Sequence, residues 1–230
     1  MNNYEIKEYI KCRDDIEYFF YNYITIENPE RHYTPSYNQN QNNFFHITNI
    51  KEKSYFDCGR QIGSTTAGLV KALHTAIFKD YQRIVYFSHK NDYSKILNSK
   101  LIFMIQNLPD FLKPAVKVYS QNVMEFENNS KILFTSNIII IKGMSINLMV
   151  FDNYILDNDF FSYFLPIYPD TKIIVINSGS VNKIQKSWKQ YKDTSFNYML
   201  TPIHTEEEKE NILKSLTKEE YYKEYMCIDG

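Results

Sequence analysis

The chain has 230 residues, of which 43% are hydrophobic and 23% charged, and its formal net charge is -1. This length suits one substantial domain that buries a core without disulfides. The charge balance gives no indication of a strong, autonomous DNA-binding surface, although it leaves room for a local basic patch. Cys12, Cys58 and Cys227 form no C-x-x-C pair, so that neither a zinc site nor a disulfide framework is expected. No signal-peptide pattern opens the chain, and its longest aliphatic run is too short to cross a bilayer, which predicts a soluble intracellular protein.

The first 53 residues are predicted to form a small helical lobe that ends in a loop. Apolar residues recur at helical spacing from Ile6 to Tyr23, which indicates one or two short helices. The polar stretch 28–43 contains Pro29 and Pro35 and is predicted to be mostly loop.

Residues 54–205 alternate between short apolar runs and amphipathic ones, which is typical of an α/β core. Aliphatic strands that alternate with helices favour a mostly parallel sheet with helices on both faces. A helical tail is predicted for 206–230. The predicted strands are 54–58, 83–88, 116–120, 123–127, 131–136, 147–152, 171–177 and 196–203, and the predicted helices are 65–78, 90–108, 182–192 and 206–225.

The stretch GRQIGSTT, residues 59–66, resembles a phosphate-binding loop without its central cation. Such loops read G-x-x-x-x-G-K-[ST]; their glycine turn presents backbone N–H groups at a helix N-terminus, and their lysine reaches the phosphates. Gly59 and Gly63 bound the turn and Thr65 stands where a Mg²⁺-ligating hydroxyl belongs, but Ser64 replaces the lysine. The alternative is a plain strand-to-helix connection with Ser64 or Thr65 as the N-cap.

Two further strand ends fit the same kind of site. Asp152 ends an apolar strand, as the Mg²⁺-positioning acid of phosphate-loop enzymes does. The glutamate that usually follows is Asn153, and an amide cannot accept a proton from water. Asn177 and Ser178 follow the next strand, where such folds sense the γ-phosphate. Each alone could be an ordinary turn, but their order and spacing favour a nucleotide site.

These observations predict one shared edge of the sheet. Asp57, Ser88, Asp152 and Asn177 are expected at the carboxyl ends of neighbouring strands, with residues 59–65 arching over the same edge. Ligands of open α/β sheets bind at that edge.

Read as a whole, the chain resembles the ATPase domain of the large terminase subunit of tailed bacteriophages, the DNA-packaging motor. The resemblance covers nearly all residues and rests on the order of the stretches GRQIGSTT, NLPDFLKPAV, MEFENNSKI, KGMSINLMVFDN and TKIIVINSGSV. It implies a RecA/ASCE-type P-loop NTPase fold with a small helical N-terminal or lid element.

The resemblance also implies roles for individual positions. Arg60 corresponds to an arginine finger acting in cis, and Thr65 and Asp152 correspond to the Mg²⁺ ligands. The implied catalytic group is Asp152, Asn153 and Arg60. The implied nucleotide-binding set is Gln41, which would read the adenine, with Gly59, Arg60, Gln61, Gly63, Ser64, Thr65 and Thr66, and the implied coupling motif is Asn177, Ser178 and Gly179.

Four departures from the family pattern point to a degenerate enzyme. Ser64 replaces the loop lysine, Asn153 replaces the glutamate, Lys142 replaces an arginine, and the coupling motif lacks its proline. A lost phosphate-clamping cation forfeits several kcal/mol of charge stabilisation, and a lost water-orienting carboxylate costs roughly 10²–10⁴-fold. We therefore expect weak or absent ATP hydrolysis and doubtful binding of ATP and Mg²⁺. Arg60 or Lys142 could restore part of the phosphate binding, but neither could restore the base.

The expected partners are other packaging, capsid or portal proteins, or an intact terminase, in the host cytoplasm and transiently at the procapsid portal. DNA contact is expected to be weak or indirect, and no membrane contact is expected. The family's nuclease domain would begin about where this chain stops, so none is expected in it. Two alternatives stay open: an active packaging ATPase with a rewired site and the nuclease on a separate chain, and an interaction protein that retains only the fold.

Overall fold

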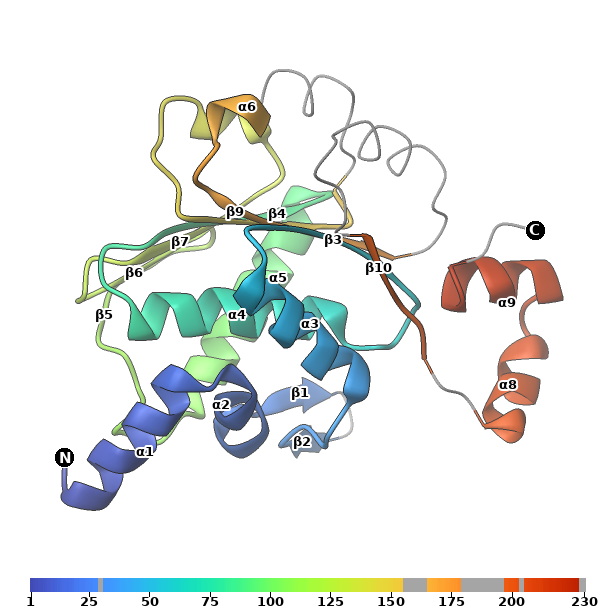
Figure 1. Cartoon of the computed structure of the whole chain (residues 1–230), viewed down its shortest axis with the longest axis horizontal. Coiled ribbons are helices and arrows are strands. Elements are labelled where there is room, and N and C mark those ends of the chain that lie inside the picture. Colours follow the sequence, from blue (N-terminus) through green and yellow to red (C-terminus); the bar gives the residue numbers. More distant parts are fainter. Residues whose placement is uncertain (29–30, 155–164, 179–196, 203–204, 228–230) are drawn as a thin grey trace.

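The computed structural model describes residues 1–28, 31–154, 165–178, 197–202 and 205–227. The described residues form an eight-stranded sheet in the order β10-β3-β9-β8-β4-β7-β6-β5 (Figure 1). The six strands from β10 to β7 are parallel, and β6 and β5 are antiparallel to their neighbours. The bounds are β3 Lys53–Cys58, β4 Arg83–Ser88, β5 Val116–Tyr119, β6 Val123–Phe126, β7 Lys131–Thr135, β8 Leu148–Asp152, β9 Lys172–Ser178 and β10 Asn197–Leu200.

The helices of the described residues cover the two faces of this sheet unequally (Figure 1). One face carries α3 (Gln39–Ile50), α4 (Ser64–Phe78) and α5 (Asn91–Gln106), with α1 (Asn3–Asp14) and α2 (Ile16–Tyr23) outside them. The other face carries the short η1 (Ile138–Ile141) and α6 (Leu165–Ile167). Beyond β10 lie α8 (Glu206–Leu213) and α9 (Lys218–Tyr225). The predicted mostly parallel α/β fold is confirmed.

The central strands are buried from both sides, which explains their continuous apolar sequences. All residues of β8 are buried, as are all but the first residues of β3 and β4. On the α4 side, Leu69 and Leu73 belong to the main core cluster. On the opposite side, the Phe87 and Phe151 rings stack with centroids 4.5 Å apart. Parallel strands covered on both faces are expected to read this way.

Two predicted segments differ in the structure. Residues 39–43 were predicted to be loop but form the start of α3, because the Asn38 side chain accepts from the N–H groups of Asn40 and Gln41 and caps the helix. Residues 26–33 contain a small antiparallel hairpin, β1 (Ile26–Asn28) and β2 (Arg31–Tyr33). The prediction of a mostly irregular stretch was therefore wrong.

The tail, which was predicted to be helical, contains two helices. Capping boxes, in which a threonine and a glutamate three residues later bond each other's backbone N–H groups, begin both α8 and α9 at Thr205 and Thr217. The predicted helix 182–192 lies outside the described residues. Among the helices that are described, none has the length and apolar character needed to cross a membrane.

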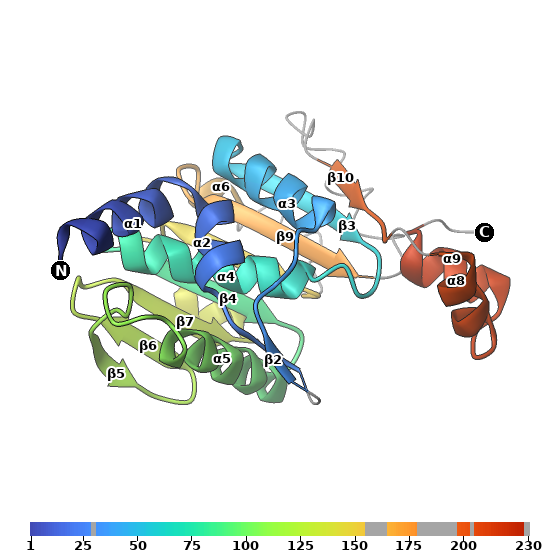
Figure 2. The ribbon, with the colours of Figure 1, turned by 90° about the horizontal axis from the view of Figure 1, so that it is seen from below.

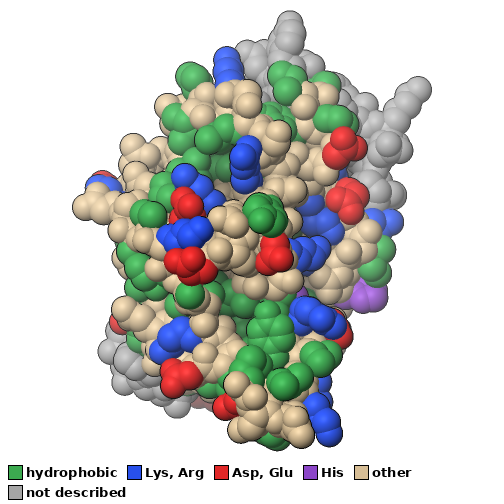
Figure 3. All heavy atoms as spheres, turned by 90° about the vertical axis from the view of Figure 1, so that its left-hand side faces the viewer, with side chains coloured by type: hydrophobic (Ala, Val, Ile, Leu, Met, Phe, Trp, Pro, Cys, Tyr) green, Lys and Arg blue, Asp and Glu red, His purple; other side chains and the backbone are tan. Residues whose placement is uncertain are grey.

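The face seen in Figure 3, at the left-hand side of Figure 1, carries charges of both signs. Lys and Arg side chains are interspersed there with Asp and Glu, and the described residues in this view show no broad area of one sign. A mixed surface of this kind does not create the strong single-sign field that steers nucleic acid onto a protein.

A buried carboxylate in the N-terminal helices provides a stability test. Glu8 accepts hydrogen bonds from Lys11 Nζ at 2.7 Å and from the hydroxyls of Tyr18 and Tyr23 at 2.7 and 2.6 Å. These donors, with Lys11 foremost, lower the pKa of Glu8 from 4.5 to about 2. The carboxylate therefore stabilises the fold above about pH 4.5, and that contribution is lost as the pH falls toward 2.

Glu8→Gln is accordingly expected to lower the melting temperature at pH 7 and to flatten the acid-induced loss of stability between about pH 4.5 and pH 2. Thermal melts across this range check it. Glu27→Gln, at an exposed position, is the matched control. Parallel pH profiles for the parent and Glu8→Gln would contradict the assignment.

Candidate functional site

Polar side chains from four neighbouring strands meet at one edge of the sheet. The strands β3, β9, β8 and β4 are adjacent, with Asp57 in register with Asn177 and Ser88 in register with Asp152. Asn177 Nδ2 donates to Asp57 Oδ1 at 3.1 Å. These four residues therefore lie at the carboxyl ends of neighbouring parallel strands, as predicted, where α/β sheets bind ligands.

The loop between β3 and α4 turns sharply onto this edge. Gln61 and Gly63 both adopt left-handed backbone conformations, with φ of 65° and 78°. Gly63 is the N-cap of α4, so neither Ser64 nor Thr65 is the cap that the alternative interpretation required. In the part of the chain that the structure describes, no side chain caps the first turn of the helix, so the backbone N–H groups of residues 64–66 are available there as donors for an anion.

Gly63 also allows Gln41 to approach the loop. Gln41 Nε2 on α3 donates to the carbonyl oxygen of Gly63 at 3.3 Å. A Cβ at position 63 would lie 2.3 Å from that nitrogen, which is impossibly close. The residue proposed to read adenine is thus packed against the loop, although its role remains a prediction.

Asp152 and Thr65, the predicted Mg²⁺ pair, are joined through Tyr86. The Tyr86 hydroxyl lies 3.1 Å from Asp152 Oδ2 and 3.3 Å from the Thr65 carbonyl oxygen. Gly68 on α4 makes room for it, because a Cβ there would lie 2.8 Å from the hydroxyl oxygen. Tyr86 was missed by sequence reasoning, since an aromatic residue in a buried strand reads as core.

Asp152 is fully buried, and its carboxyl is correspondingly hard to ionise. Desolvation raises its pKa from 3.8 to about 6, against the lowering effects of hydrogen bonds from Thr65 and Tyr86 and of the Lys100 charge. A buried carboxylate beside a threonine hydroxyl is an oxygen donor set that suits Mg²⁺. A perturbed pKa at a ligand-binding edge is also typical of a functional site.

Asn153 turns away from the strand in a left-handed conformation, with φ of 50°. Its N–H donates to the Ile176 carbonyl oxygen at 2.8 Å, and its Nδ2 lies 3.4 Å from Asp152 Oδ1. Asparagine tolerates this backbone conformation better than most residues. The group beside the Asp152 carboxylate is therefore a hydrogen-bond donor and not a base.

Arg60 pairs with the C-terminal tail. Its side chain is 61% exposed, and its Nε lies 2.5 Å from Glu224 Oε2 on α9. Figure 2 shows α8 and α9 beyond the same end of the sheet as the loop that follows β3. The structure thus places Arg60 at the loop, as predicted, but directs its guanidinium to the tail.

The remaining predicted residues lie at different depths. Ser64 is buried at the start of α4, where its side chain interacts with the Cys58 thiol and opposes the rise in the Cys58 pKa that burial causes. Thr66 is half-buried, and Lys142 is exposed at the end of η1. The side chain of Ser178 and all of Gly179 lie outside the described residues.

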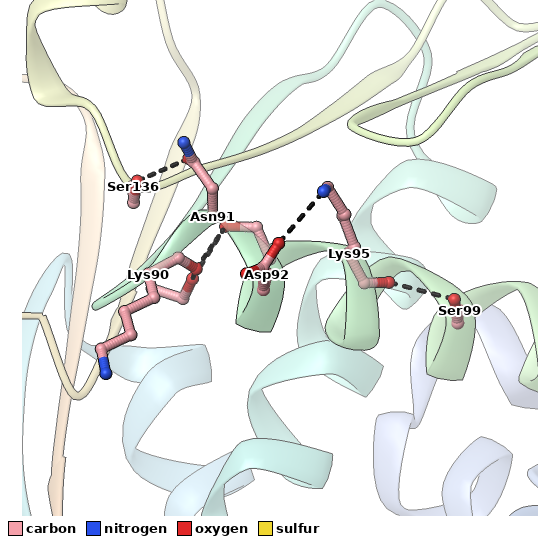
Figure 4. A network of polar contacts seen from close by, with 8 residues as sticks. Lys90, Asn91, Asp92, Lys95, Ser99 and Ser136 are labelled. Atoms are coloured by element: carbon pink, nitrogen blue, oxygen red, sulfur yellow. Dashed lines mark hydrogen bonds and ion pairs between the residues drawn. The ribbon is translucent and has the colours of Figure 1, made fainter.

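A polar network fixes the neighbouring connection from β4 to α5 (Figure 4). The Ser88 hydroxyl donates to the Lys90 carbonyl oxygen at 3.0 Å and shares a 2.8 Å hydrogen bond with Ser94. Ser136, just after β7, donates to Asn91 Oδ1 at 2.6 Å. The Lys90 side chain points away from the Asn91–Ser136 contact (Figure 4), and its ammonium has no hydrogen-bond or ion-pair partner among the residues that the structure describes.

Comparison with known proteins places this arrangement in a family context. A family model of the N-terminal part of the T4likevirus-type terminase large subunit matches residues 56–161. A mutant ATPase domain of the Thermus phage P74-26 large terminase is similar with a TM-score of 0.65 and 12% identity, covering 86% of this chain and 95% of that one.

Longer terminases share the same fold. The large terminase of bacteriophage HK97 gives a TM-score of 0.65 at 11% identity, covering 84% of this chain and 44% of that one. A large terminase from a thermophilic bacteriophage, solved in complex with ADP, gives 0.62 at 12% identity, covering 84% and 53%. This chain therefore spans about half the length of these two relatives. The matches confirm the predicted resemblance to large-terminase ATPase domains and the RecA-like α/β fold.

Proposed function

We propose that this chain is a terminase-type ATPase domain of viral DNA packaging in which ATP hydrolysis is lost or strongly weakened, and that it acts through contacts with other packaging proteins. The observation that carries the proposal is Asn153, an amide donor held in a left-handed turn beside the buried Asp152 carboxylate. Ser64 at the lysine position of the loop supports the same conclusion.

In this proposal, the described residues of the nucleotide edge would bind a nucleotide but would hydrolyse it slowly. Thr65 and Asp152 would hold Mg²⁺, the N–H groups at the start of α4 would face the phosphates, and Gln41 would face the base. Bound Mg²⁺ would neutralise phosphate charge. A relative of this fold was solved with ADP and with ATP-gamma-S, which supports nucleotide as the ligand. The residue next to Asp152 carries an amide, so the carboxylate that would accept the proton of an attacking water at that position is replaced.

The purified protein is expected to show no Mg²⁺-dependent ATP hydrolysis above the background of its Asp152→Ala variant. A phosphate-release assay at saturating ATP measures this. Turnover in the ordinary enzyme range, about 1 s⁻¹ or faster, that disappears in Asp152→Ala would refute the proposal.

Lys90 favours one alternative, an active ATPase with a rewired site. Its ammonium is without a described partner, and the residue stands two positions beyond Ser88, which is in register with Asp152. If turnover is found, Lys90→Met should abolish it. Lys95→Met, which removes an ammonium that pairs with Asp92 at 3.1 Å, should leave it unchanged.

The proposed partners are portal, capsid or other packaging proteins, or an intact terminase, with DNA contacted weakly or indirectly. An intact terminase gene in the same genome would support this proposal, because that terminase could hydrolyse ATP while this chain contacts other packaging proteins. Co-purification of this chain with that terminase, unaffected by Asp152→Ala, would separate a protein-contact role from a catalytic one.

A further inference from the structure

The helix α9 covers the first half of the phosphate loop. The Arg60 N–H donates to the Glu224 carbonyl oxygen at 3.0 Å, and the Arg60 guanidinium bonds the Glu224 carboxylate. The neighbouring Gly59 N–H donates to the Leu200 carbonyl oxygen at 2.8 Å, at the end of β10. Segments 164 residues apart thus meet at the loop through both backbone and side chain.

Gly59 is what allows this close approach. A Cβ at position 59 would lie 2.1 Å from the Tyr225 carbonyl oxygen and 2.6 Å from Pro202 Cδ. Within α9, Tyr221 and Tyr225 are both buried and stack on each other with ring centroids 5.4 Å apart. The C-terminal end of α9 and the residues after β10 therefore pack closely against the backbone of Gly59.

We infer that α9 is a latch on the nucleotide site, in which the Glu224 carboxylate competes with the phosphates of a nucleotide for Arg60. The inference rests on the proposed function, since it requires this edge to be a nucleotide site. Carboxylate and phosphate bind a guanidinium in the same forked geometry. While Glu224 holds Arg60, the arginine of a loop that lacks its lysine is withheld from the phosphates.

The ion pair between Arg60 and Glu224 is weak enough for a nucleotide to break it. The ion pair is partly exposed, with 61% of the Arg60 side chain and 28% of the Glu224 side chain accessible to water. Exposed ion pairs are weak, so a nucleotide that offers several phosphate oxygens can displace the carboxylate. Opening would free the Arg60 N–H and guanidinium together, because both bond the same residue.

The test uses Glu224→Gln, which keeps the size of the side chain and removes its charge. Glu210→Gln on α8 is the matched control, because Glu210 is exposed in the same tail. Two quantities are measured in the full chain: the affinity for ATP with Mg²⁺ by titration, and the rate at which phenylglyoxal modifies Arg60, followed by peptide mass spectrometry with and without ATP. The latch predicts about two- to fivefold tighter binding in Glu224→Gln, faster modification of Arg60, and protection by ATP, with Glu210→Gln like the parent.

Equal affinity in the parent and Glu224→Gln overturns the latch, whether or not Arg60 reacts faster. Absence of binding by Glu224→Gln at millimolar ATP overturns it as well. Failure of the proposed function is seen separately, as rapid ATP turnover by the parent. Tighter ATP binding by Glu224→Gln, together with no ATP turnover by the parent, supports both the latch and the proposed function.

Discussion

Replacing Asp152 with asparagine is expected to stabilise the protein at neutral pH by about 1–3 kcal/mol. The carboxyl is buried, no cation among the described residues forms an ion pair with it, and its pKa is raised from 3.8 to about 6. The native state therefore binds its proton more tightly than the unfolded state does. The resulting stability is full below about pH 3.8 and is lost as the pH rises through 6. Asparagine keeps the shape and removes the buried charge.

Urea unfolding at pH 8 and at pH 5 measures this effect. The gain in the free energy of unfolding from Asp152→Asn should be larger at pH 8, where the parent carboxylate is ionised. Asp110→Asn is the control, since the Asp110 side chain is fully exposed. A variant that is less stable than the parent at pH 8 would show that the ionised carboxylate is well satisfied in the fold.

The sign of this effect bears on function. A carboxylate that lowers the stability of its own fold is kept for something other than folding, and a bound cation would offset the cost. If Mg²⁺ with ATP raises the melting temperature of the parent but not of Asp152→Asn, the carboxylate is a ligand. This measurement therefore tests whether the carboxylate that destabilises the free protein is the one that binds Mg²⁺ in the proposed site.

The sequence predicted the parts of the site that lie on buried strands. Asp57, Asp152 and Asn177 each follow an aliphatic run, and the carboxyl ends of parallel strands must share an edge. The turn before α4 was predictable for a similar reason, because Gly63 precedes a helical pattern.

The rest depends on contacts between distant segments. Nothing local to Glu224 indicates that it pairs with Arg60, and nothing local to Tyr86 indicates that its hydroxyl reaches Asp152. The left-handed turn at Asn153 depends on its N–H meeting Ile176 on the neighbouring strand. By contrast, the break between α8 and α9 was readable, since both capping boxes are local patterns.

Restoring the loop lysine by Ser64→Lys is expected to strengthen the binding of ATP with Mg²⁺ well beyond that of the parent. The lysine supplies the cation that clamps the phosphates in a preorganised loop, a contribution of several kcal/mol. Ser64 is buried in the first turn of α4, so a lysine there should lower the melting temperature of the free protein, both by burial and by its like sign to the helix dipole. Ligand should reverse that loss, because a molecule that binds only the folded state stabilises it.

Ser64→Met is the control for size, since it fills similar space without a charge. The ligand-dependent rise in melting temperature should appear in Ser64→Lys at ATP concentrations that leave Ser64→Met and the parent unchanged. Removal of Asp152 from the Ser64→Lys protein should abolish the rise if Mg²⁺ is held there.

Adding Asn153→Glu to Ser64→Lys should bring slow hydrolysis at most. The new carboxylate could accept the proton of the attacking water, but glutamate at a φ of 50° carries a backbone cost of roughly 1–2 kcal/mol. The two changes act on one bound ligand, so their effects should not add. If the double variant shows no ligand-dependent shift at millimolar ATP, the loop geometry has itself diverged from a phosphate site, and an interaction protein that retains only the fold becomes the better hypothesis.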